Sequence, residues 1–333
     1  MLLSLAAAAA AAAASICSPA DSDRRWIDAA RAAWRSRLAA IPELRAPPAV
    51  EVILFDHRCR FSSADALDDR ASVRWTGGTH GGKVRLADGS AIPVGVTSFA
   101  GEGKRGSTFV MALPSIWAAA KVKTAPLDLD RLTTAVLLHE ASHVAQGRLM
   151  TRVGALVRRR GFGEDFNDDS IQLRFEQNAA FTASVREETR LLFAAAQAPD
   201  DAAARMLARQ ARDAIKARRS RWMRGADRPL AQAEDLFLSM EGAGQYVGYS
   251  WLIDPAGGGV TRAAAMARFG AGPRWWSQAQ GLALVLAIER LGLRNWRGHL
   301  WGEPRLVGAE LLDAALRPAL TSSGSGRTRQ GSR

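Results

Sequence analysis

Apolar residues recur at helical spacing near the start of the chain. A helix predicted over residues 21–41 places five apolar side chains on one face: Trp26, Ile27, Ala30, Trp34 and Leu38. Pro42 and the Pro47-Pro48 pair follow directly, and proline ends helices because it lacks the backbone donor. The pattern predicts an amphipathic helix that packs one face against the rest of the protein.

Between residues 49 and 117 the pattern changes to short apolar runs separated by glycine-rich turns, which is typical of β-strands. The predicted strands are Val50–Phe55, Val73–Trp75, Val84–Leu86, Ile92–Phe99 and Ser107–Leu113. The last of these is compatible with two positions, an edge strand that can pair with an extended peptide or a plain interior strand.

From residue 126 onward the helical period dominates. The predicted helices span residues 128–146, 170–197, 202–223, 229–252, 276–291 and 309–316. The order of elements predicts an α+β fold, in which a small, mainly antiparallel sheet is followed by a helical body. We expect an N-terminal α/β region at 21–125 with a substrate-binding sheet, a helical catalytic region at 126–320, and a disordered tail at 321–333.

The first residues form an unbroken apolar run from Leu2 to Ile16, which is shorter than the roughly 20 residues that span a bilayer as a helix. Small residues precede two candidate cleavage points, Ala14 and Ala20, so residues 1–20 are predicted to be a signal peptide. No basic residue precedes the run, and Cys17 leaves lipid attachment open. We therefore expect a periplasmic or secreted protein without a transmembrane helix after signal removal.

The chain has 333 residues and a net charge of +12, which by itself could indicate nucleic acid or an anionic membrane as a partner. The positive residues are spread along the chain among acidic ones, without interleaved aromatic residues, so we expect no specific nucleic-acid partner. The two cysteines, Cys17 and Cys59, exclude a disulfide-rich scaffold. Early signal cleavage would permit a bridge between them, and late cleavage would leave Cys59 alone.

The predicted helix at 128–146 contains the sequence His139-Glu140-Ala141-Ser142-His143. Histidines at positions i and i+4 lie on one helical face, so both imidazoles can bind a single Zn²⁺ ion. A zinc ion lowers the pKa of water toward about 7, and Glu140 is placed to take the proton as the water attacks a carbonyl. The motif predicts His139 and His143 as metal ligands and Glu140 as the general base.

A catalytic zinc site needs a third protein ligand. The candidates are Glu241, Glu176, Glu187 and Glu188. The first is favoured, because the run before it is apolar and the small residues Gly242, Ala243 and Gly244 permit a close approach of helices.

His-Glu-Ala-Ser-His followed by Glu241-Gly-Ala-Gly-Gln-Tyr246 resembles the gluzincin metallopeptidases, the thermolysin-like superfamily of peptidase clan MA. The resemblance covers roughly residues 107–252 and implies that Glu241, on a second helix, completes the zinc site. Two features depart from the superfamily. The 98 positions from His143 to Glu241 imply inserted helices at 170–224, and Gln245 stands where an acidic residue often supports a ligand histidine. Glu234 or Asp235 could supply that support instead.

Tyr246 and Tyr249 follow Glu241 and are the only tyrosines in the chain. A tyrosine near the metal can donate to the oxyanion of a tetrahedral intermediate, and it can equally be a packing residue. The sequence thus predicts a zinc metallopeptidase that acts on a peptide or protein substrate. The alternative is a catalytically inactive metal-binding or envelope-binding scaffold of the same fold.

We expect the first 14 to 20 residues to be absent from the mature protein, because the apolar run has the length of a signal sequence. Sequencing the N-terminus of protein recovered from the envelope or medium measures this directly. An intact Met1 on protein recovered from the cytoplasm would contradict the export prediction.

Overall fold

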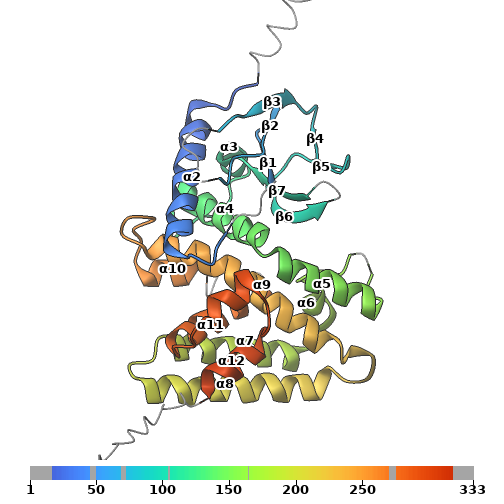
Figure 1. Ribbon diagram of the computed structural model, residues 1–333, viewed down its shortest axis with the longest axis vertical. Helices are drawn as coiled ribbons and strands as arrows, with labels where there is room; N and C mark the ends of the chain where they lie inside the picture. The colour runs from blue at the N-terminus through green and yellow to red at the C-terminus, as the bar shows by residue number, and fades with distance from the viewer. Residues whose placement is uncertain are drawn as a thin grey trace, which may run out of the picture.

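The protein is described here by a computed structural model, in which a small β-sheet is followed by a helical body (Figure 1). The described residues are 17–45, 50–68, 73–103, 106–163, 165–269 and 275–317. Most of the predicted signal peptide and the whole predicted tail at 321–333 lie outside these ranges. The α+β class and the order of its two parts are confirmed.

The main sheet has five strands in the order β3-β2-β1-β7-β6. Their bounds are β1 Val50–Phe55, β2 Cys59–Ser63, β3 Thr76–Thr79, β6 Ser98–Gly103 and β7 Gly106–Ala112. Only the β1–β7 pair is parallel, and the other pairs are antiparallel, so the sheet is mainly antiparallel as predicted. A separate two-stranded ribbon joins β4 (Lys83–Arg85) to β5 (Ala91–Pro93).

The strand predictions were correct at the centre of the sheet and less accurate at its margins. Val50–Phe55 is β1, but the Val73–Trp75 segment precedes β3, and β2 was missed because its sequence is largely polar. The predicted strand Ile92–Phe99 is divided between β5 and β6. Of the two positions considered for Ser107–Leu113, the interior one is correct, because β7 lies between β1 and β6. The edge strand is β6, which folds back on β7 as a hairpin.

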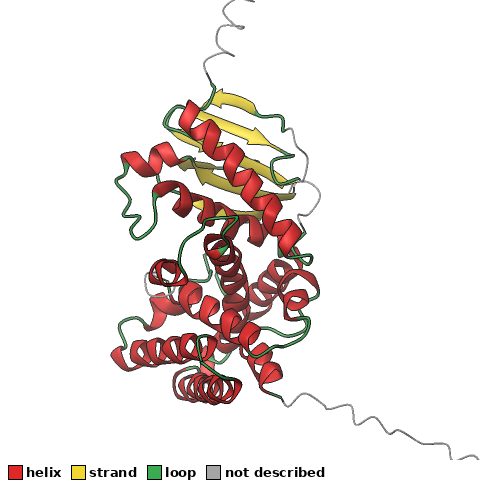
Figure 2. Ribbon diagram, turned by 90° about the vertical axis from the view of Figure 1, so that its left-hand side faces the viewer, coloured by secondary structure: helices red, strands yellow, loops and turns green. Residues whose placement is uncertain are grey.

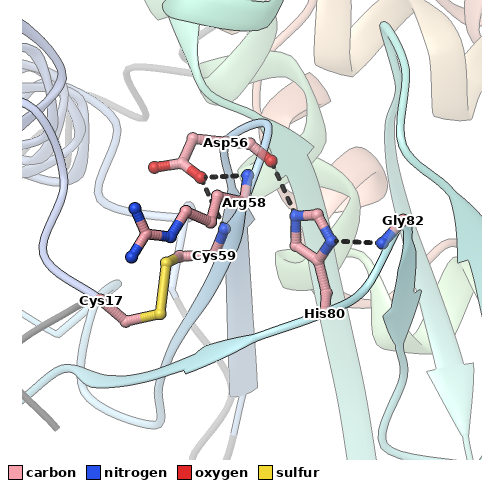
Figure 3. The surroundings of a disulfide bond; sticks show 6 residues. All are labelled: Cys17, Asp56, Arg58, Cys59, His80 and Gly82. Carbon is pink, nitrogen blue, oxygen red and sulfur yellow. Dashed lines mark hydrogen bonds between the residues drawn. A yellow bond between two sulfur atoms is a disulfide. The ribbon is translucent and has the colours of Figure 1, made fainter. Parts of the chain in front are cut away.

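A disulfide between Cys17 and Cys59 ties the start of the described chain to β2 (Figure 3). The turn that presents Cys59 is held by Asp56, whose carboxylate accepts hydrogen bonds from the backbone amides of Arg58 and Cys59. His80 contacts the Asp56 carbonyl oxygen from the neighbouring strand connection, with 2.9 Å between the atoms. The bridge occupies the Cys17 sulfur that lipid attachment would require.

The helices have the following bounds: α2 Asp21–Ala40, α3 Pro114–Ala119, α4 Leu129–Ala145, α5 Gly147–Arg160, α6 Ser170–Phe175, α7 Ala179–Ala196, α8 Asp201–Trp222, α9 Leu230–Ile253, α10 Arg262–Phe269, α11 Trp276–Arg290 and α12 Ala309–Leu316. The prediction missed α3, α5 and α10. It also joined α6 and α7, which are separate because the Asn178 side chain caps a new helix by accepting from the amide of Phe181.

Helix α4 connects the two parts of the molecule. It contacts β6 and β7 on the sheet side and α9 on the side of the helical body, while α2 packs against it alongside the sheet (Figure 2). Buried apolar residues form one core that runs from β1 through α4 to α11, for example Ile53, Leu138 and Leu284. The position of α4 inside this core fixes the helix that bears the His-Glu-Ala-Ser-His sequence.

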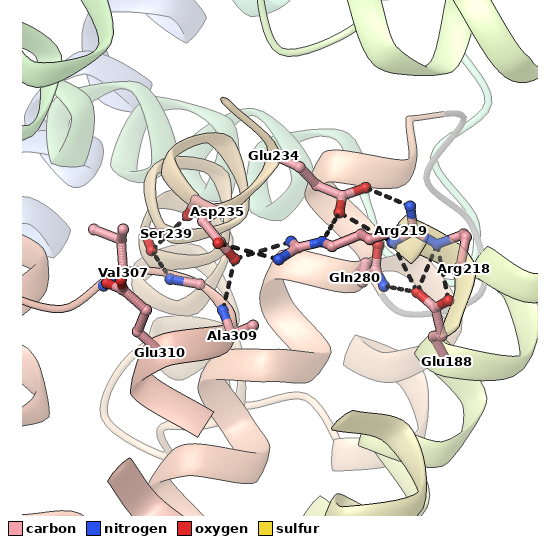
Figure 4. Close-up of polar contacts among 11 residues, drawn as sticks. Glu188, Arg218, Arg219, Glu234, Asp235, Ser239, Gln280, Val307, Ala309 and Glu310 are labelled. Atoms are coloured by element: carbon pink, nitrogen blue, oxygen red, sulfur yellow. Dashed lines mark hydrogen bonds and ion pairs between the residues drawn. The ribbon is translucent and has the colours of Figure 1, made fainter. Parts of the chain in front are cut away.

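The helical body contains a buried network of ion pairs (Figure 4). Arg218 of α8 is fully buried and donates to the carboxylates of Glu188 on α7 and Glu234 on α9. Arg219 donates to Glu234 and to Asp235 on the same helix. Gln280 of α11 donates to Glu188 as well. Since every charge in this network has opposite charges beside it, it joins α7 and α8 firmly to α9 and α11.

Among the helices of the described chain, none is both long and apolar enough to cross a membrane.

We predict that Arg218→Met destabilises the protein by about 3–5 kcal/mol, since removal of one partner leaves Glu188 buried without its counter-charge. Urea unfolding followed by circular dichroism measures the change in the free energy of unfolding. The control is Arg190→Met on α7, where the Arg190–Glu187 pair is exposed and its removal should leave the midpoint nearly unchanged. Equal effects of the two substitutions would show that the buried network does not stabilise the fold.

Candidate metal centre

Two histidines of α4 converge on one point. Asp128 caps the helix by accepting from the amide of Arg131, and the helix then continues without interruption to Ala145. His139 and His143 are one turn apart and both largely buried, and their Nε2 atoms lie 2.9 Å from each other. The spacing of the motif therefore places two imidazole nitrogens in position to share a cation.

The third group in this cluster is Glu241 of α9. Its two carboxylate oxygens lie 3.3 Å from His139 Nε2 and 3.2 Å from His143 Nε2. The side chain is only 4% exposed. The structure thus brings together all three side chains that the sequence predicted as metal ligands, although His143 and Glu241 are 98 positions apart in the chain.

Glycines allow this approach. A Cβ atom on Gly244 would lie 2.8 Å from His139 Nδ1, and one on Gly248 would lie 2.8 Å from the Ala135 carbonyl oxygen. These two glycines are one helical turn apart on the face of α9 that contacts α4. Gly242, in contrast, approaches Gly281 on α11, on another face. Small residues around Glu241 therefore allow α9 to contact two helices closely. Gly244 and Gly248 allow the contact with α4, and Gly242 allows the contact with α11.

The distances among the three candidate ligand side chains are compatible with a bound metal ion. Zn–N and Zn–O bonds of about 2.0–2.1 Å in a tetrahedral site separate ligand atoms by about 3.3 Å. The two Nε2 atoms lie 2.9 Å apart, and the nearer Glu241 oxygen lies 3.3 Å from His139 (Oε2) and 3.2 Å from His143 (Oε1). His139, Glu140 and His143 also form a group whose ligand atoms lie within 4.8 Å of one another. The residues present can hold a metal ion, and two nitrogens with one carboxylate are typical of zinc sites.

The electrostatics of the site favour a cation. Burial opposes protonation of His143, yet the Glu241 carboxylate beside it raises the pKa of this imidazole to about 9. Burial would likewise raise the pKa of Glu241, but His143 and His139 hold it well below its usual range. Positive charge at the centre of the cluster, whether a proton or a metal ion, therefore stabilises these groups.

The support of the ligand histidines differs from the prediction. Gln146, at the C-terminal end of α4, contacts His143 Nδ1 through its side-chain oxygen at 2.9 Å and donates to the Leu300 carbonyl oxygen. Glu234 and Asp235, the supports that we expected, are engaged with Arg218 and Arg219 instead. The prediction was wrong because buried arginines from α8, which sequence spacing does not reveal, occupy both carboxylates.

Glu140 lies beside the candidate metal ligands, and its own hydrogen bond is to a residue of the sheet. Its carboxylate accepts a hydrogen bond of 3.0 Å from the hydroxyl of Ser98, the first residue of β6. The same carboxylate lines a cavity of about 350 Å³ together with His143 and Glu241. A polar residue at the start of the edge strand therefore orients the predicted general base toward the cavity that the metal ligands face.

The two tyrosines are not brought to the metal ligands. The Tyr246 hydroxyl donates to Glu289 of α11 at 2.5 Å and accepts from Arg297 at 3.0 Å. Burial and the adjacent Glu289 carboxylate raise the pKa of Tyr246 well above its usual value, which favours the protonated, donating form of the hydroxyl. Tyr249 is buried in the main core, eight residues or roughly 12 Å along α9 from Glu241. Packing, the alternative considered for both residues, agrees with these positions.

The other candidate carboxylates lie elsewhere. Glu187 pairs with Arg190 on the protein surface, Glu188 belongs to the buried network around Arg218, and Glu176 is exposed after α6. None of the three is among the described residues that line the cavity in front of His143.

Sequence reasoning missed three residues of the site: Ser98, Gln146 and Asp168. Gln146 follows His143 by three positions, which places both on one side of the helix end, so helical spacing could have indicated it. Ser98 and Asp168 come from a strand and a loop far from α4 in the chain, and no local pattern identifies them. A larger cavity of about 660 Å³ lies between α2 and the start of α4, and it includes none of the predicted ligands.

Comparison with known proteins finds no family model, no curated protein and no solved structure that matches this chain. The resemblance to the gluzincins therefore depends on the two short motifs and on the order of the elements that bear them.

We predict that Glu241→Ala weakens zinc binding far more than Glu176→Ala or Glu187→Ala, because only the first removes an oxygen from the cluster. Competition with a chromophoric chelator measures the zinc affinity of each variant, and circular dichroism confirms that each is folded. A zinc affinity of Glu241→Ala equal to that of the two control variants would exclude Glu241 as a ligand.

Proposed function

We propose that this protein is a zinc-dependent metallopeptidase that hydrolyses peptide bonds. The observation that supports the proposal most directly is the convergence of His139, His143 and Glu241 within 3.3 Å of one another, with the Glu140 carboxylate beside them. Three protein ligands leave the fourth position of a tetrahedral zinc site free for water or substrate, which distinguishes catalytic zinc sites from structural ones.

Each side chain of the site has a distinct role in the proposed hydrolysis. A bound zinc ion supplies Lewis acidity, which acidifies water and polarises the substrate carbonyl. Glu140 accepts the proton of the attacking water and delivers it to the leaving amine, as a general base and then a general acid. Ser98 holds the Glu140 carboxylate by its hydrogen bond, and Gln146 holds the His143 ring in one orientation.

The edge strand offers a place for the substrate. β6 pairs with β7 on one side only, and its residues Ser98, Phe99 and Ala100 line the cavity in front of Glu140 and His143. An extended peptide that adds to this edge would make main-chain hydrogen bonds with β6 and pass the metal centre. The strand that we propose for substrate binding is thus β6, in place of the segment Ser107–Leu113.

A location outside the cytoplasm is part of the proposal. The Cys17–Cys59 disulfide supports it, since such bridges persist in oxidising compartments. The apolar run that precedes Cys17 in the sequence has the character of an export signal.

We predict that Glu140→Gln retains zinc but loses peptidase activity by at least about 10²-fold, because it removes the general base and leaves the ligands in place. Zinc content is measured by atomic absorption, and hydrolysis is measured on a fluorogenic peptide library. A chelator should abolish wild-type activity, and added zinc should restore it.

Two results would contradict the proposal. Full activity of Glu140→Gln would exclude Glu140 as the base. A wild-type protein that binds zinc tightly yet cleaves no member of the library would support the alternative, a metal-binding scaffold without catalysis.

A further inference from the structure

The cavity in front of the metal centre contains one more carboxylate than the proposed chemistry uses. Glu140, Glu241 and Asp168 all line it, and no lysine or arginine does so among the described residues. A divalent cation balances two of these negative charges. With neutral histidines as ligands, one negative charge remains, and a buried charge without a partner is costly. The cavity is therefore suited to a ligand that brings a positive charge.

Asp168 is the residue that bears this excess charge. It lies in the loop before α6, and its closest described partner is the Ser277 hydroxyl of α11, at a long 3.4 Å. Burial, together with the neighbouring Glu241 and Asp169 carboxylates, raises the pKa of Asp168 to about 7. Because Gln146 holds His143, Asp168 is not needed to orient that ligand. No cationic side chain of the described chain forms an ion pair with it.

About half of the residues that line the cavity are apolar, most of them large. They come from the edge strand, from α5 and its following loop, and from α9: Phe99, Met150, Val153, Phe166, Phe237 and Met240. A volume of about 350 Å³ accommodates one or two residues of a peptide. Apolar side chains beside the Asp168 carboxylate, which neither binds the metal nor acts as the base in the proposed chemistry, match a group that has a hydrocarbon stem and a positively charged end, as lysine and arginine side chains do.

We propose that Asp168 selects substrates with a cationic group next to the scissile bond, by forming a charge-assisted hydrogen bond with that group. The group is an ammonium or guanidinium, supplied either by a basic side chain or by the N-terminal amine of the peptide. This inference rests on the proposed peptidase function and adds a substrate class to it. Asp168 acts here as a specificity-determining residue, while the metal ligands and Glu140 perform the chemistry.

The experiment compares six peptides of one sequence. One position beside the cleaved bond is lysine, norleucine or glutamate, and each version is made with a free and with an acetylated N-terminus. Wild type, Asp168→Asn and the control Asp165→Asn are compared by kcat/KM. The control removes an exposed carboxylate of the same loop that does not line the cavity. Dissociation constants of the same peptides are measured calorimetrically in a zinc-loaded Glu140→Gln background, with and without Asp168→Asn.

We expect wild type to favour a cationic peptide over its neutral counterpart by at least about tenfold, as charge-assisted hydrogen bonds to a half-buried carboxylate provide. Selection of lysine over norleucine would assign the site to a side chain, and selection of the free over the acetylated N-terminus would assign it to the amine. Asp168→Asn should remove most of that preference in kcat/KM and in the dissociation constant, and Asp165→Asn should keep it.

Equal use of cationic and neutral peptides by wild type would overturn the inference, whether or not Asp168→Asn folds. A preference that survives in folded Asp168→Asn would overturn it too, and in both cases peptidase activity would stand. Failure of the peptidase proposal looks different, since wild type would then cleave none of the peptides. In that event the dissociation constants decide. Equal constants both for lysine and norleucine peptides and for free and acetylated N-termini would overturn the role of Asp168.

Discussion

The close contact between α4 and α9 is the constraint on which the metal centre depends. Neither helix can form the site alone, because α4 supplies two nitrogens and α9 supplies the carboxylate between them. The helices approach closely enough only because Gly244 and Gly248 present no side chain toward His139 and Ala135. Backbone packing at two glycines thus determines whether Glu241 reaches the histidines, and any bulk added there would separate the ligands before it changed their chemistry.

Two buried carboxylates of α9 are neutralised in different ways. Glu234 at the start of α9 is neutralised by Arg218 and Arg219, which belong to α8 and fix the helical body around it. Two turns further along, Glu241 has no arginine partner among the described residues, and histidine nitrogens face it instead. The first arrangement is complete within the protein itself. The second is most stable with a cation at its centre, and this difference separates a structural cluster from a candidate metal centre.

The sheet and the helical body contribute to the site unequally. The sheet supplies β6, whose first residue orients Glu140 and whose free edge borders the cavity. The body supplies the candidate metal ligand Glu241, several apolar side chains of the cavity and Asp168. Helix α4 contacts both parts, so the histidines and Glu140 lie at their junction. The architecture explains how a short motif on one helix can combine with groups from a strand, a loop and a second helix.

The sequence by itself determined the features that depend on local spacing. One helical turn between His139 and His143 places both rings on one face, and the apolar run Val50–Phe55 specifies the central strand, so both were predicted correctly. Glu241 was preferred on its small neighbours and on the family resemblance, and the tertiary structure brought it to the histidines. Only the tertiary structure showed that β6 is the edge, that Gln146 and not Glu234 or Asp235 supports His143, and that Asp168 enters the cavity. The position of β6 and the entry of Asp168 into the cavity depend on contacts between residues tens of positions apart. The support of His143 depends on which residues already pair with Glu234 and Asp235. Packing between elements distant in the sequence decides all three features.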